Sequence, residues 1–138
     1  MATTLILDSE ALNALARANE RPVLAERARA ILRVAYEERA LVRVPAPVLA
    51  EVCRGGRFDA AVERVLNGRG IGVHALDDAI AKRAGSLLAR AKLTSEHAID
   101  AFVVATAAAH SPAVIATGDR TDLTRLASGL RGLRLFVV

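Results

Sequence analysis

Cysteine is almost absent from the chain. The 138 residues include a single cysteine, Cys53, so no disulfide can form within the chain. Disulfides are characteristic of oxidising compartments, and a chain that cannot form one is suited to a reducing compartment. We therefore expect a cytoplasmic protein in which Cys53 packs as a small apolar group rather than acting as a nucleophile.

Long apolar runs are also absent. A transmembrane helix needs roughly 20 consecutive apolar residues, and the longest candidate, Ala98–Ala109, is interrupted by Asp100. Residues 1–7 lack a basic lead and run directly into Asp8. We expect neither a membrane span nor a signal peptide.

Aromatic residues are scarce. They make up 3% of the chain, which has no tryptophan, whereas hydrophobic residues make up 53%. Alanine, leucine and valine must therefore fill the core, which suits helices packed closely on a sheet. Recognition of single-stranded nucleic acid by base stacking usually depends on Phe, Tyr or Trp platforms, so this mode is disfavoured. If nucleic acid binds, we expect arginine contacts to phosphate to dominate.

The chain carries a modest excess of positive charge. Its formal net charge is +4 and its pI is near 10.2, with arginine supplying nearly all of the cations. Two interpretations remain open, namely solvated arginine-rich helix faces or a surface that binds phosphate. The same two apply to a group of arginines near Glu51, as a basic rim or a solvated face: Arg54, Arg57, Arg64 and Arg69.

Short apolar runs alternate with longer amphipathic segments along the chain. The runs predict strands at residues 3–7, 41–44, 71–75, 113–116 and 133–138. The segments between them predict helices at residues 9–18, 22–39, 45–55, 58–66, 77–91, 95–109 and 120–127, with Ser9, Asp77 and Ser95 as N-caps. Strands separated by helices need crossover connections and form parallel sheets. We therefore predict a single α/β domain over residues 1–138, a three-layer α/β/α sandwich with a mostly parallel five-stranded central sheet.

Acidic residues stand where the strands of this sheet end. Asp8 follows the first strand, Glu51 lies one helical turn beyond the second, and Asp119 follows the fourth. Ligands of open parallel sheets gather at the carboxyl ends of the strands. Asp100 lies among apolar residues on a predicted helix. Because burial of an isolated carboxylate is costly, four such groups together indicate a shared divalent cation with oxygen ligands.

Each acid also has a structural interpretation. Asp8 and Asp119 could cap the helices that follow them, and Glu51 could pair with Arg54. Asp122, in the first turn of a predicted helix, would be favoured by the helix dipole alone. His97, His74 and His110 show no zinc-ligand spacing. His97 lies one turn before Asp100 and could touch the site, but we expect it to be a solvated helix residue.

Four segments resemble the motifs of PIN-domain nucleases, in the family's order and over nearly the whole chain. They are Leu5–Leu12 (LILDSEAL), Pro47–Val52 (PVLAEV), Ile99–Ala107 (IDAFVVATA) and Ile115–Leu123 (IATGDRTDL). The resemblance implies a five-stranded α/β/α sandwich and Mg²⁺- or Mn²⁺-dependent cleavage of RNA, with 5′-phosphate and 3′-hydroxyl products. It further implies a likeness to the VapC-like toxins of type II toxin–antitoxin pairs, which are usually cytoplasmic homodimers inhibited by a small cognate antitoxin.

Site residues follow from the matching positions. Asp8, Glu51, Asp100 and Asp119 would hold the metal and act in catalysis, as carboxylate-bound metals activate water for phosphodiester hydrolysis. Asp122, Ser9 and Thr117 would be accessory residues, and Arg54, Arg57 and Arg120 would bind substrate. Many relatives have Asn where this chain has Glu10, which leaves any contact of that Asn in doubt. Two alternatives remain, a catalytically silent module that binds RNA or protein, and a housekeeping nuclease without an antitoxin.

Overall fold

The computed structural model describes residues 3–68 and 70–138. Its centre is a sheet of five parallel strands in the order β3–β2–β1–β4–β5. The strands are β1 Thr4–Leu7, β2 Leu41–Pro45, β3 Gly72–His74, β4 Ala113–Thr117 and β5 Leu133–Val137. The predicted strand positions are therefore confirmed, and the sheet is wholly rather than mostly parallel.

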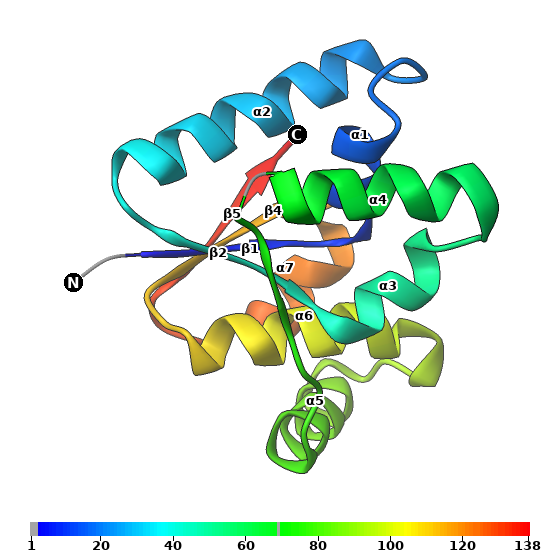
Figure 1. Cartoon of the computed structure of the whole chain (residues 1–138). Helices are drawn as coiled ribbons and strands as arrows, with labels where there is room; N and C mark the ends of the chain where they lie inside the picture. The colour runs from blue at the N-terminus through cyan, green and yellow to red at the C-terminus, as the bar shows by residue number, and fades with distance from the viewer. Residues whose placement is uncertain (1–2, 69) are drawn as a thin grey trace.

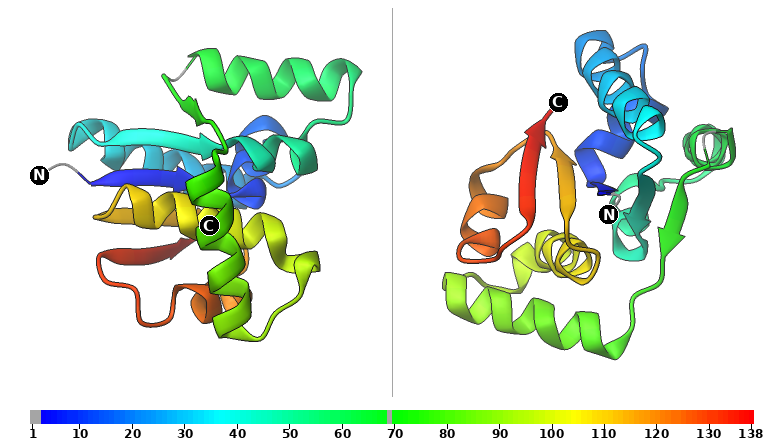
Figure 2. Two further views of the ribbon diagram at one scale, coloured as in Figure 1. Left: turned by 90° about the horizontal axis from the view of Figure 1, so that it is seen from below. Right: turned by 90° about the vertical axis from the view of Figure 1, so that its left-hand side faces the viewer.

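Helices cover both faces of the sheet, so the predicted three-layer sandwich is also confirmed (Figures 1 and 2). On one side lie α1 Ser9–Ala16, α2 Pro22–Glu37 and α4 Gly56–Gly68, with α4 against α1. On the other side lie α5 Asp78–Ala91, α6 Ala98–Ala109 and α7 Thr121–Ala127. The short helix α3 Ala46–Val52 follows β2 and contacts both α1 and α6 near the carboxyl ends of the strands.

Small and branched aliphatic side chains form the core, as the composition predicts. Ile6 and Leu7 on β1 are fully buried, and they pack between the two helical layers with Leu12 of α1 and Ile115 of β4. Burial of one such side chain contributes roughly 1.5–3 kcal/mol. This packing fixes the backbone at the end of β1, directly before Asp8.

Helix α6 is buried on most of its circumference, because α5 and α7 cover the side that faces away from the sheet. Ala101, Val103, Val104 and Ala105 are completely buried. Short side chains allow this helix to lie close to the strands, and it carries Asp100 in its first turn. The alanine-rich sequence of α6 therefore brings a carboxylate up to the carboxyl edge of the sheet.

Two predicted N-caps are wrong. The side chain of Asp8, not Ser9, caps α1 by accepting a hydrogen bond of 2.9 Å from the backbone N–H of Ala11. Residues Ser95–His97 form a separate 3₁₀ turn, η1, so α6 begins only at Ala98. Asp77 does cap α5, as predicted.

Other boundaries differ from the predicted ones by a few residues. Helices α1 and α2 end two residues earlier than expected, and α4 begins at Gly56 rather than Phe58. Among the described residues, no helix combines the length and the apolar character needed to cross a bilayer.

Candidate functional site

A pocket of about 200 Å³ opens at the carboxyl ends of β1 and β4. Strand order explains its position, because β1 and β4 are neighbours and the residues that follow them meet at the same edge. Six carboxylates and two hydroxyls line the pocket: Asp8, Glu10, Glu51, Asp100, Asp119, Asp122, Ser9 and Thr117. Every acid singled out in the sequence therefore faces one cavity, together with both predicted accessory hydroxyl residues.

Asp8 forms the buried floor of this pocket. Its side chain is only 6% exposed, and burial, the largest effect, raises the pKa of its carboxyl group from 3.8 to about 6. Hydrogen bonds from the Thr117 hydroxyl and the backbone N–H of Ala11 partly oppose this shift, whereas the charges of Glu10 and Asp100 add to it. A buried carboxylate held in this way is stabilised by a nearby cation.

Glu51 reaches the pocket from the last turn of α3. The Ser9 hydroxyl donates a hydrogen bond of 2.5 Å to its Oε1 atom. The predicted alternative, a pair between Glu51 and Arg54, is wrong. The Arg54 guanidinium instead donates to the backbone carbonyls of Ala50 and Cys53, each at 2.7 Å.

Asp100 is half-buried and surrounded by other acids. Burial is the main cause of its raised pKa, and the charges of Glu51 and Asp122 add to it. His97 acts in the opposite direction. Like-charged groups that share a site destabilise one another until a cation or a proton compensates them. Positive charge near Asp100 would therefore favour its ionised form.

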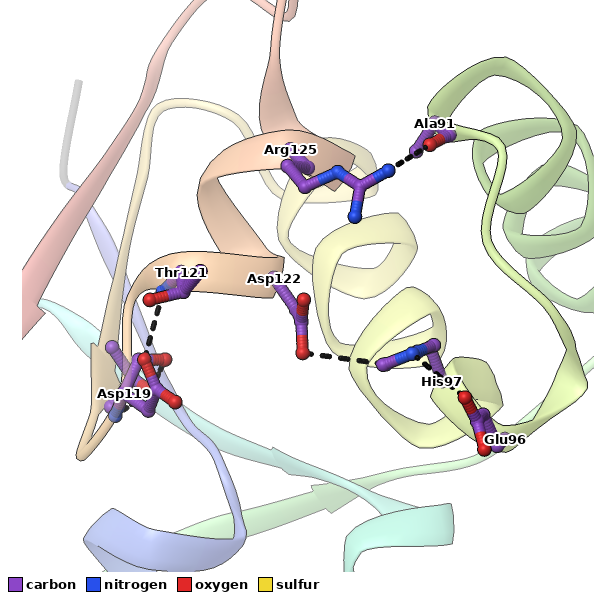
Figure 3. Close-up of polar contacts among 8 residues, drawn as sticks. Ala91, Glu96, His97, Asp119, Thr121, Asp122 and Arg125 are labelled. Atoms are coloured by element: carbon purple, nitrogen blue, oxygen red, sulfur yellow. Dashed lines mark hydrogen bonds and ion pairs between the residues drawn. The ribbon is translucent and has the colours of Figure 1, made fainter.

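Asp119 lies in a tight turn between β4 and α7. Its Oδ1 atom accepts a hydrogen bond of 2.9 Å from the backbone N–H of Thr121, and this bond lowers the pKa of its carboxyl group (Figure 3). The Thr117 hydroxyl oxygen accepts a hydrogen bond of 3.1 Å from the Asp119 N–H. Asp119 therefore fastens the turn before α7 and remains ionised at the rim of the pocket.

His97 approaches the acids from the 3₁₀ turn before α6. Its Nδ1 atom lies 3.4 Å from Oδ2 of Asp122, as Figure 3 shows. His97, Asp100 and Asp122 each offer a ligand atom, and these atoms all lie within 4.8 Å of one another. The side chain of His97 is 24% exposed, so the expectation of a solvated helix residue is wrong. Its position one turn before Asp100 was the available signal.

Glu10 also belongs to the pocket, although the sequence gave it no role. Its carboxylate lies against Gly118, and a Cβ atom at position 118 would collide with it. Glycine is therefore required in the turn after β4 for Glu10 to take this position. The sequence feature that indicates this role is the position of Glu10 two residues after Asp8.

The match to a family model follows the same framework. The PIN domain model covers residues 5–128, which contain every residue that lines the pocket. The chain belongs to the PIN domain family. PIN domains are generally nucleases that use divalent metals and bind nucleic acid, so membership indicates a metal-dependent nuclease. No curated protein shows a significant match to the chain.

Burial differs among the four principal acids of this PIN domain. Asp8 is buried and Asp100 half-buried, whereas Glu51 and Asp119 are exposed at the rim. The apolar neighbours of Glu51 and Asp119 in the sequence had suggested burial for both. In the fold Val48 and Val52 are buried beside Glu51, and Ile115 and Ala116 are buried before Asp119, whereas the two acids face the opening.

The three arginines predicted to bind substrate do not line the acidic pocket. Arg54 donates to backbone carbonyls of α3, Arg57 lies beside the ring of Phe58, and Arg120 is the exposed N-cap residue of α7. Arg69, from the predicted basic rim, lies outside the described residues. Around the pocket itself, the described lining residues include no lysine or arginine.

The donor set of the pocket suits a hard divalent cation. Carboxylate oxygens are the ligands that Mg²⁺ prefers, and Mn²⁺ accepts the same ligands together with imidazole. The buried Asp8 and the half-buried Asp100 both have raised pKa values. The carboxylate donors and the raised pKa values both indicate that a cation bound in this pocket would stabilise the protein.

Proposed function

We propose that this PIN domain, spanning residues 1–138, is an endoribonuclease that depends on Mg²⁺ or Mn²⁺. One observation carries the proposal: six carboxylates converge on one pocket whose described lining holds no basic side chain, in a chain of net charge +4. Such convergence is costly without a bound cation. Asp8, Glu51, Asp100 and Asp119 are the residues that would hold the metal.

Each acid has a distinct part in this proposal. Asp8 provides a fixed ligand at the floor, because its backbone is held by β1 and its side chain by α1. The hydrogen bond from Ser9 orients the Glu51 carboxylate, and the turn after β4 positions Asp119. A divalent cation bound there would lower the pKa of a bound water and neutralise charge developing on the phosphate.

Hydrolysis in this pocket needs no side-chain nucleophile. Cys53 has a raised pKa, mainly because of burial, which disfavours the reactive thiolate. The scissile phosphate would enter from the open side, where Glu51 and Asp119 are exposed. Products with a 5′-phosphate and a 3′-hydroxyl are expected, with water as the attacking group.

We further propose that the chain is the toxin of a type II toxin–antitoxin pair, cytoplasmic and homodimeric, with a small cognate antitoxin as its inhibitor. The four motifs that resemble those of PIN-domain nucleases support this role, because that resemblance implies a likeness to VapC-like toxins.

The test is cleavage of a labelled structured RNA by the purified full chain with Mn²⁺, Mg²⁺ or EDTA. The proposal predicts cleavage with either metal, none with EDTA, and products that a 5′-phosphate-dependent exonuclease degrades. Cleavage that persists in EDTA would contradict it. For the toxin role, induced expression should arrest growth, and co-expression of a small neighbouring open reading frame should restore it. Unimpaired growth with proven nuclease activity would instead indicate a housekeeping nuclease.

A further inference from the structure

Phe58, in the first turn of α4, lies outside the hydrophobic core. The other two phenylalanines, Phe102 and Phe136, pack against the core, whereas Phe58 is not among the described side chains that do so. The Cζ atom of Arg17 lies over the Phe58 ring, 4.3 Å from its centroid, and that of Arg57 lies 5.5 Å away. The Arg17 guanidinium and the Phe58 ring thus form one cation–π group outside the core, the Arg17–Phe58 platform.

A hollow of about 290 Å³ surrounds this platform and carries a positive charge balance. Its charged lining consists of Arg17, Arg57 and Arg64, opposed only by Glu20 among the described residues. Arg57 and Arg64 are exposed, and Arg17 is half-exposed. Phosphate groups are therefore attracted to the same place where a planar group can stack.

A second hollow, of about 420 Å³, lies along one side of α1 between this platform and the acidic pocket. It shares Glu10 with the acidic pocket and shares Arg17 and Glu20 with the hollow at Phe58. Glu10, Asn13 and Arg17 follow one another at helical spacing, so they lie on one face of α1. Arg17 lies about 10 Å further along the helix axis than Glu10.

The wall of the second hollow contains an unsatisfied polar group. The Oδ1 atom of Asn13 is buried and has no hydrogen-bond partner within the described structure. A buried acceptor without a partner is uncommon in native proteins. A polar ligand lying along α1 could supply a donor after rotation of this amide. The three hollows thus follow one another along α1 through shared lining residues, and this polar track ends at an aromatic ring.

We propose that the single-stranded flank of an RNA substrate follows this track and that one of its bases stacks on the Arg17–Phe58 platform. The inference rests on the proposed ribonuclease activity and extends it to a substrate-binding site outside the acidic pocket. Arginine planes and aromatic rings are the surfaces on which single-stranded RNA bases stack. A peptide partner would bury little apolar surface in a track this polar. An RNA strand would use the arginine charges for its phosphates and the Phe58 ring for a base.

The test measures RNA affinity in EDTA, so that binding is separated from cleavage. The probe is a fluorescent single-stranded RNA of about ten nucleotides, and the readout is its anisotropy with wild type and variants. Phe58→Leu keeps an apolar side chain without a π face, and we expect about tenfold weaker binding. Phe58→Trp keeps the stack and should bind at least as tightly as wild type. Arg17→Lys keeps the charge without the planar group and should also weaken binding.

Arg83→Gln is the matched control, because Arg83 is exposed on α5 and lines none of the three hollows. Melting temperatures equal to that of wild type show that Phe58→Leu folds. Unchanged RNA affinity in both Phe58→Leu and Arg17→Lys would overturn the inference and leave the track to a protein partner. RNA binding that depends on Phe58 but is never followed by metal-dependent cleavage would support the track and contradict the proposed hydrolysis.

Discussion

The Ser9 hydroxyl and the Glu51 carboxylate are joined by a hydrogen bond of 2.5 Å, although 42 positions separate the two residues. The bond links the first turn of α1 to the last turn of α3 across the mouth of the acidic pocket. Glu51 is exposed, so without this contact its carboxylate would sample several rotamers in water. Ser9 thus determines which way one of the proposed metal ligands points.

Substitution of Ser9 should loosen that ligand without removing it. Groups that orient metal ligands typically contribute 10–100-fold to affinity, and because Glu51 is exposed we expect the low end, about a tenfold loss of Mn²⁺ affinity, in Ser9→Ala. Ser9→Thr keeps the hydroxyl and should stay near wild type. The measurement is Mn²⁺ titration by calorimetry. Equal affinity in Ser9→Ala and wild type would show that Glu51 needs no such support.

Without a bound metal, the Asp8 carboxyl group makes the fold less stable at neutral pH than at acidic pH. The pKa of its carboxyl group is about 6 in the folded chain and 3.8 in the reference state, so the folded chain holds the proton more tightly. The stability that Asp8 contributes is full below pH 3.8 and is lost as the pH rises through about 6. The shift corresponds to a contribution on the order of 3 kcal/mol.

Asp8→Asn should therefore be more stable than wild type at pH 7.5 in EDTA, by up to about 3 kcal/mol. Asparagine caps a helix as well as aspartate does, so the N-cap of α1 is kept. The difference should shrink as the pH falls from about 6 to 3.8, and Mn²⁺ should stabilise wild type more than the variant. Urea unfolding at several pH values measures this. A variant less stable than wild type at pH 7.5 would contradict the assigned cost of burying this carboxylate.

Much of this arrangement could be predicted because it follows local rules. The alternation of apolar runs with amphipathic segments predicts the strands and helices, and parallel strands place Asp8 and Asp119 at one edge. Strand order is not a local property. Only the adjacency of β1 and β4 brings Asp8 beside Thr117, and no pattern within either segment shows that adjacency.

The remaining differences arise from contacts between distant segments. Asp8 rather than Ser9 caps α1, which leaves the Ser9 hydroxyl to reach Glu51. Both types of residue are good N-caps, so propensity alone could not choose between them. His97 lies in a 3₁₀ turn rather than in a continuous α-helix, and its contact with Asp122 joins two segments that are distant in the sequence.

Gly118 should tolerate no side chain while Glu10 keeps its place. A Cβ atom at position 118 would meet the Glu10 carboxylate, so Gly118→Ala must displace either that side chain or the turn that carries Asp119. We expect a loss of about 1–3 kcal/mol in stability. Adding Glu10→Ala should recover part of this loss, because the Glu10 carboxylate is the nearest obstacle. A double-mutant cycle by thermal unfolding measures the coupling, and strict additivity would refute the contact.

The most direct test of the acidic pocket compares RNA cleavage by wild type, Asp100→Asn and Asp78→Asn with Mn²⁺ under single-turnover conditions. Asp78 is the matched control, since its side chain is 88% exposed on α5 and faces Lys82 rather than the pocket. The account predicts that Asp100→Asn folds normally and loses cleavage by at least about a thousandfold, equivalent to roughly 4 kcal/mol, while Asp78→Asn cleaves like wild type. Cleavage by Asp100→Asn at the wild-type rate would place the chemistry elsewhere and contradict the account.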